Sequence, residues 1–177
     1  VSVDAAGTTD LGRQARYESD TFVSAATLSA LVLTSKTGTA TIRGSVTADD
    51  AVSTSLNASS AIAKAAAIND SSETTGVRAI VGETNFSGSV AVGTATLDET
   101  NYLTINDQKI SGITVESNDA SGSLVDAINA VSSETGVVAS LDESSKLVLT
   151  AADGRNIEVQ FSTGTLGTAL GSFSTLA

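Results

Sequence analysis

The sequence predicts an α+β protein that is mainly antiparallel β with two short helices, arranged as two related β-β-α-β-β-type units. Short segments in which apolar and polar residues alternate, bounded by Gly, Asn, Asp and Ser, indicate half-buried strands. Two other segments have apolar residues at helical spacing, which indicates helices with one buried side. The two helical segments share a sequence pattern at an offset of sixty residues, which indicates an internal repeat.

The clearer helix is expected at about residues 123–133. Ser123 followed by Asp126 forms a Ser-x-x-Asp sequence, which makes Ser123 the candidate N-cap. Ile128 lies on the apolar stripe of this segment. Gly136 follows where a helix commonly ends in the left-handed conformation.

Strands are expected on both sides of this helix. Before it, residues 102–105 and 110–115 are β-rich and are separated by a turn at Asn106-Asp107. After it, the expected strands are residues 137–141, 147–149 and 157–161. The chain after Phe161 is rich in Gly and is expected to be a flexible return segment, although Leu166, Leu170 and Phe173 could pack as a short edge.

The other helix is expected at about residues 60–72, with Ser59 or Ser60 as its N-cap. Its buried stripe should consist of Ala61, Ile62, Ala65 and Ile68. Strands are expected at residues 39–46 and 77–81, and residues 21–33 favour a strand over a helix. Two units follow: residues 1–98 with an N-terminal linker and the first helix, and residues 99–177 with the second helix and the C-terminal return segment.

The internal repeat supplies the candidate structural positions. They are Ile68, Asn69, Gly76 and Val77, which recur sixty residues later as Ile128, Asn129, Gly136 and Val137. We expect each Ile to pack in the core and each Asn to hydrogen-bond a neighbouring turn, because polar side chains beside turns commonly satisfy local backbone groups. The alternative is that the Asn residues bind a ligand.

At these residues the chain resembles a known family. Residues 123–139, SLVDAINAVSSETGVVA, are similar to the Ile-Asn module of bacterial flagellins and hook-associated proteins, and residues 61–69 with 75–79 resemble a second copy. The resemblance implies the surface-exposed middle region of a flagellin, in a secreted, extracellular flagellar filament that supports motility. It implies other flagellin subunits as partners, through parts of the protein outside this sequence, and O-glycans on exposed Ser or Thr. We expect the isolated fragment to be monomeric.

The composition excludes several classes of function. With no His and no Cys, neither a Ser-His-Asp triad nor a Cys or His zinc site can form. Asp49 and Asp50 lack the spacing of a calcium loop. The net charge of −11 disfavours nucleic acid and anionic membranes as partners. We therefore expect no enzymatic activity, cofactor or metal.

Two alternatives to a filament subunit stay open. The Ile-Asn module also occurs in hook-associated and cap proteins, so the resemblance covers them as well. A glycan-binding or host-surface binding module is the other alternative, although aromatic residues, which such sites favour, are only 3% of the chain.

Overall fold

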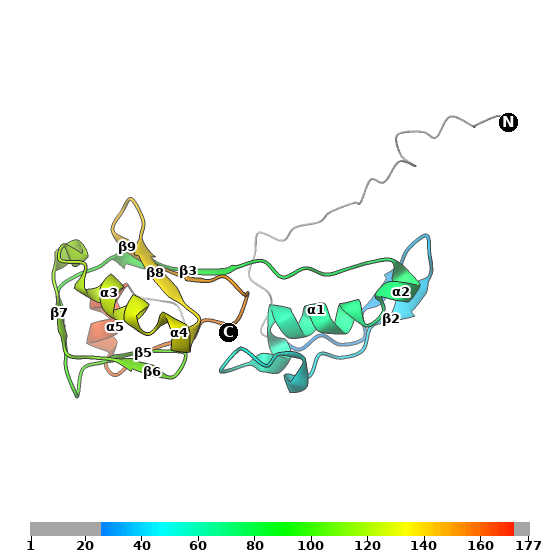
Figure 1. The fold of residues 1–177 in the computed structure, drawn as a ribbon, viewed down its shortest axis with the longest axis horizontal. Helices are drawn as coiled ribbons and strands as arrows, with labels where there is room; N and C mark the ends of the chain where they lie inside the picture. Colours follow the sequence, from blue (N-terminus) through cyan, green and yellow to red (C-terminus); the bar gives the residue numbers. More distant parts are fainter. Residues whose placement is uncertain (1–25, 172–177) are drawn as a thin grey trace, which may run out of the picture.

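The computed structural model describes residues 26–171, which form two lobes. An extended segment joins them and continues into β3 (Thr84–Ala91) of the second lobe (Figure 1). The linker expected before residue 21, part of the strand expected at residues 21–33, and Phe173 lie outside the described residues.

The first lobe consists of one short hairpin, two 3-10 turns and two helices. Its elements are β1 (Val32–Thr34), β2 (Thr39–Thr41), the 3-10 turns η1 (Thr47–Asp49) and η2 (Asn57–Ser59), α1 (Ala61–Asn69) and α2 (Ser72–Thr75). Strand β1 pairs antiparallel with β2, and α1 packs on the two 3-10 turns. Ser60 is the N-cap of α1, where its side chain accepts the amide of Ala63 at 3.0 Å.

The second lobe holds the remaining elements, in three small sheets. After β3 these are β4 (Ala95–Leu97), β5 (Leu103–Ile105), β6 (Gln108–Ile110), β7 (Ile113–Val115), η3 (Ser117–Asp119), α3 (Ser123–Ala130), α4 (Ser132–Thr135), β8 (Val138–Leu141), β9 (Lys146–Ala151), β10 (Val159–Phe161) and α5 (Gly164–Leu170). The sheets have the strand orders β3-β9-β8, β10-β5-β6 and β4-β7, with every pair antiparallel. The expected α+β class with mainly antiparallel strands is therefore confirmed.

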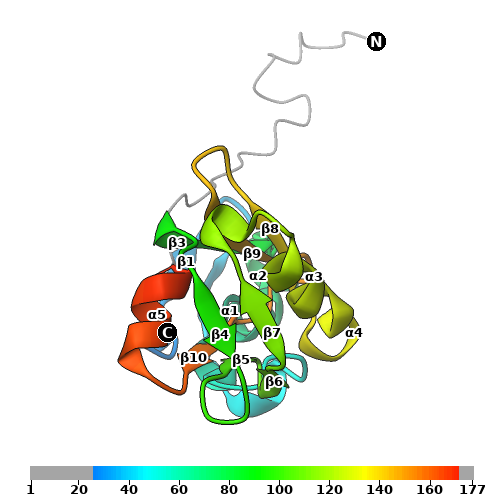
Figure 2. The ribbon, with the colours of Figure 1, turned by 90° about the vertical axis from the view of Figure 1, so that its left-hand side faces the viewer.

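The two lobes differ in the size of their cores. One hydrophobic cluster fills the second lobe, with α3 on one side of the strands and α5 on the other (Figure 2). In the first lobe the large buried side chain is Ile42, and the buried positions of α1 are Ala63, Ala65 and Ala67. Because buried alanines contribute little apolar area, this lobe obtains less stabilisation from burial than the second.

Strand pairing also crosses the boundary expected between residues 98 and 99. Strands β3 and β4 precede residue 98, yet β3 pairs with β9 and β4 pairs with β7. The lobes also touch through polar groups: the amide of Asn156 donates to Ser53 Oγ at 3.0 Å, and its Nδ2 donates to the Ser55 carbonyl at 3.0 Å.

Several sequence-based expectations about the first lobe are wrong. No strand is assigned at residues 76–83, so the strand expected at residues 77–81 is absent. The stripe on α1 is displaced, because Ala61, Ile62 and Ile68 are only half-buried. The helix itself stops at Asn69 and a separate turn of helix, α2, follows. Strand β2 ends at Thr41, earlier than expected.

The C-terminal segment is also more ordered than expected. Instead of a flexible return, residues 164–170 form α5, and Leu166 and Leu170 insert into the core of the second lobe. The Thr163 side chain caps this helix by accepting the amide of Leu166. Burial of the two leucines outweighs the low helix propensity of its glycines.

The N-terminus of α3 is capped from outside the helix. Ser123 is the first helical residue and not the N-cap, and its hydroxyl donates to the Thr114 carbonyl at 2.8 Å. The buried carboxylate of Asp119 accepts the amides of Leu124 at 2.9 Å and Val125 at 3.0 Å. A carboxylate at this end also interacts favourably with the helix dipole.

Replacing Asp119 with Ala should therefore lower the free energy of unfolding by about 1–2 kcal/mol, the usual loss for a side-chain helix cap. Chemical denaturation measures this change. The control is Asp126→Ala, which removes an exposed carboxylate from the first turn of the same helix. Equal effects of the two substitutions would contradict the capping role of Asp119.

Candidate functional site

The central contact of the second lobe is a pair of hydrogen bonds between one side chain and one residue of a strand. Asn129, at the end of α3, donates from Nδ2 to the Ala139 carbonyl at 3.1 Å. Its Oδ1 accepts the Ala139 amide at 2.7 Å. The side-chain amide thus contacts both backbone groups of one residue, as a neighbouring strand would, and it attaches α3 to the first strand that follows it.

The first lobe contains the same contact. Asn69 Nδ2 donates to the Ala79 carbonyl at 3.0 Å, and Asn69 Oδ1 accepts the Ala79 amide at 2.8 Å. The partner lies ten residues after the asparagine in both lobes. The bonds thus reach the extended backbone beyond the turn, and not the turn itself as expected from the sequence.

The turn between each asparagine and its partner is built alike as well. Gly76 has φ 65° and Gly136 has φ 70°, both in the left-handed region that favours glycine. The residue before each glycine is a buried threonine, Thr75 or Thr135. Its hydroxyl donates back to the carbonyl four residues earlier and accepts the amide two residues later.

The end of α4 receives additional support from side chains far along the chain. The Thr135 carbonyl accepts Asn106 Nδ2 at 2.9 Å and Arg155 Nη1 at 3.2 Å. A Cβ at position 136 would lie 2.2 Å from Arg155 Cζ, so the guanidinium occupies the space that glycine leaves. A cation at this place also interacts favourably with the C-terminal end of a helix.

Sequence reasoning missed these supporting residues. Thr75 and Thr135 also match at the repeat offset, so the repeat itself could have indicated them. Asn106 was expected only as a turn residue, and that turn is present, with φ of 44° at Asn106 and 67° at Asp107. No local pattern indicates that Arg155 packs against Gly136, because the contact depends on the fold.

The two copies differ in how deeply their Ile and Val side chains are buried. In the second copy Ile128 and Val137 are fully buried. In the first, Ile68 is half-buried and Val77 is 37% exposed. The reason is that β8 pairs with β9, whereas residues 77–83 pair with no strand in the described part of the chain.

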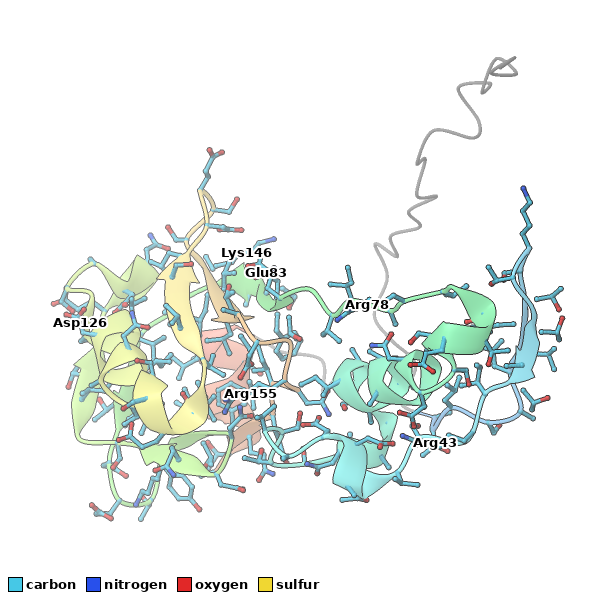
Figure 3. The ribbon with its side chains drawn as sticks, turned by 45° about the vertical axis from the view of Figure 1, so that its right-hand side comes forward. Arg43, Arg78, Glu83, Asp126, Lys146 and Arg155 are labelled. Atoms are coloured by element: carbon cyan, nitrogen blue, oxygen red, sulfur yellow. The ribbon has the colours of Figure 1, made fainter. Side chains whose placement is uncertain are left out.

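Hydrogen bonds from charged and neutral donors lower the pKa of several carboxyl groups. The hydrogen bond from Arg43 holds the pKa of Asp49 below its ordinary value, and that from Arg155 does the same for Asp153. At Asp98 the amide of Asn101 and the Thr100 hydroxyl lower the pKa. Arg43 and Arg155 lie in different lobes (Figure 3), so both lobes contain such a group.

Metal-binding clusters and membrane-spanning helices are both absent from the described residues. Within residues 26–171, no group of three or more acidic side chains is placed to hold a metal ion. No helix in the same range is long and apolar enough to cross a membrane. The arrangement around Asn69 and Asn129 positions the backbone through hydrogen bonds.

Comparison with known proteins agrees with this structural character. Residues 103–153 match the family model described as the flagellin hook IN motif, which includes Asn129 and Gly136. The resemblance to bacterial flagellin is thereby confirmed for this part of the chain. The match includes the second copy of the repeat and not the first.

Flagellins are also the relatives found among curated proteins. The chain is 43% identical over 94 residues to Flagellin A of Helicobacter pylori, a match that covers 52% of this chain and 18% of that protein. It is 42% identical over 92 residues to Flagellin A of Helicobacter mustelae, covering 51% and 18%. Flagellin B of Helicobacter pylori is 43% identical over 93 residues, covering 52% and 17%. The match thus spans less than a fifth of these relatives.

Replacing Asn129 with Asp tests the side-chain pair at constant size. The variant loses the donor to the Ala139 carbonyl and places a second oxygen against it, so the free energy of unfolding should fall by about 2 kcal/mol. The matched control is Asn69→Asp, which should cost less because the backbone that it bonds pairs with no strand and is more exposed. A larger loss at Asn69 than at Asn129 in chemical denaturation would contradict the stated order.

Replacing Gly136 with Val should destabilise the protein by about 2 kcal/mol, because valine disfavours positive φ. The added side chain would also displace Arg155. Thermal melting measures the effect, with Gly164→Ala as the control, since a Cβ at Gly164 has no contact within 4 Å. Unchanged melting of the Gly136 variant would rule out the strain.

Acid should unfold the protein, whereas stability should be nearly constant between about pH 6 and 8, because the chain has no His. A carboxyl group whose pKa is lower in the folded state stabilises it fully above the unfolded value, about 3.9 for Asp. That contribution disappears as the pH falls through the folded-state pKa. Melting temperatures measured at decreasing pH should therefore start to fall near pH 4. The decrease should be less steep in Arg155→Met, because this variant lacks the hydrogen bond that lowers the pKa of Asp153. No decrease down to pH 2 would contradict the role of these groups.

Proposed function

We propose that this chain is the outer part of a flagellar filament subunit, which supports motility as a structural component exposed to the medium. The observation that carries the proposal is the Ile-Asn unit, seen in the Asn129–Ala139 pair and matched by the flagellin hook IN motif. The flagellin relatives extend the likeness to about half of the chain.

The surface chemistry supports an exposed position. The net charge is −11, and acidic side chains keep a displayed domain soluble and separate from its neighbours. Other flagellin subunits are the proposed partners, through parts of the protein outside this sequence. The protein would be secreted and extracellular, with O-glycans on exposed Ser or Thr.

Residues 61–79 are proposed to be a second copy of the same unit. They reproduce the asparagine pair, the buried threonine and the left-handed glycine of residues 121–139. The candidate structural residues are therefore Ile68, Asn69, Gly76, Val77, Ile128, Asn129, Gly136 and Val137.

A hook-associated protein is the second candidate, favoured by the description of the matching family, which includes the hook. Immunogold electron microscopy with antibodies against this chain separates the two. Label along whole flagella is expected for a filament subunit, and label confined to the hook junction or the tip would replace it with the second candidate. No label on flagella, with a positive blot of the same cells, would overturn both.

A further inference from the structure

The backbone of residues 77–81 has an unused pairing edge. Asn69 bonds the amide of Ala79 at 2.8 Å and its carbonyl at 3.0 Å, so these two groups are directed toward α1. In an extended chain the neighbouring residues direct their backbone groups to the opposite side, so those of Arg78 and Ile80 face away from α1. No strand in the described part of the chain pairs with them.

The second lobe shows that an edge of this kind can hold a strand. There Asn129 bonds both backbone groups of Ala139 in the same way, and the residues on either side of Ala139 stand opposite residues of β9. The backbone beside Ala79 is therefore held ready for a neighbouring strand that the described residues do not supply.

The length of the free edge is set by the structure at its two ends. Gly76, with φ 65°, ends α2, so the extended backbone begins after it. At the other end, a Cβ at Gly154 would lie 2.6 Å from the Gly82 carbonyl oxygen, so a turn of the second lobe occupies the space beside Gly82. The segment between these glycines crosses above α1 (Figure 1). The free edge therefore consists of residues 77–81.

The side chains at this edge are unusually apolar for a surface. Val77 is 37% exposed, and Ile80, at 81%, is the most exposed large hydrophobic side chain of the described residues. Between them lies exposed Arg78, which forms no ion pair with a described residue (Figure 3). Exposed strand edges with apolar side chains favour pairing with another chain.

We propose that this edge binds a second copy of this chain, and that residues 77–81 of the two copies pair as antiparallel strands around a two-fold axis. In such a contact each copy supplies the same surface. An edge of this length pairs over its whole length in one register only, with Ala79 opposite Ala79 of the other copy. Arg78 then stands opposite Ile80, and the backbone groups of both residues are bonded. The inference concerns the chain itself and does not depend on the filament role proposed above.

The side chains and charges of the edge fit another copy. Opposite Ile80 lies the methylene stem of Arg78, which covers apolar surface while its charged end stays in water. Two copies repel each other, because each has a net charge of −11, and an unpaired arginine at the contact reduces that repulsion. The paired strands bury less than a standard interface of about 1,600 Å². The pair should thus be weak in dilute solution and stronger with added salt, which screens the repulsion.

Single cysteine variants test the pairing, because the natural chain has no Cys. Ala79→Cys places the thiol opposite itself at a pair without hydrogen bonds, where the two Cβ atoms lie about 5 Å apart. The matched control is Val77→Cys, because in this register the two copies of position 77 are too far apart for a disulfide.

In concentrated protein under air, Ala79→Cys should form disulfide-linked dimers about tenfold faster than Val77→Cys. Exposure alone predicts the opposite order, since Val77 is exposed and Ala79 is half-buried. Equal rates, or faster dimer formation by Val77→Cys, would overturn the proposal.

Hydrogen exchange of the unmodified chain gives an independent result. Exchange of the Arg78 and Ile80 amides should slow as the protein concentration rises, and slow further with added salt. Arg78→Glu should remove this dependence on concentration, whereas Arg78→Lys should retain it. Exchange that does not change with concentration would overturn the proposal, because fast exchange would show a free edge and slow exchange an edge covered within one chain.

Discussion

The fold of both lobes depends on one type of contact, in which the side-chain amide of an asparagine bonds both backbone groups of a residue ten positions later. A carboxamide has one acceptor and two donor hydrogens, so it can replace a peptide group in a ladder. The contact fixes the start of the following strand relative to the helix. The left-handed glycine makes it possible, because the chain must reverse within the ten residues.

The same local unit leads to different results in the two lobes. In the second lobe, β8 pairs with β9, Val137 and Ile128 are buried, and a continuous hydrophobic core forms. In the first lobe the equivalent backbone lies at an edge and its apolar side chains stay exposed. Local hydrogen bonds thus set the conformation, while non-local pairing decides how much apolar surface is buried.

The difference between the lobes also separates the part of the chain that matches a known family from the part that does not. The family likeness is concentrated in the better packed second lobe, at residues 103–153. Most of the large exposed apolar side chains belong to the first lobe and the segment that leaves it.

The sequence predicted what depends on local or repeated patterns, and little of what depends on distant partners. The antiparallel α+β class and the Asn106-Asp107 turn follow from alternation and turn residues. The prediction of a strand at residues 77–81 was wrong because alternation of apolar residues does not supply a neighbouring strand. The prediction of Ser123 as the N-cap was wrong because Asp119 accepts the amides at the start of α3 from outside the helix. Helix α5 was not predicted because its glycines conceal the helical spacing of Leu166 and Leu170.

The most direct test is a measurement of scalar coupling across hydrogen bonds by NMR. The account predicts coupling from the amide nitrogen of Ala139 to the side-chain carbonyl carbon of Asn129, and from Ala79 to Asn69 in the same way. Both couplings would show that each asparagine holds the backbone ten residues later. Absence of coupling at Ala139, with rapid exchange of that amide, would contradict the account.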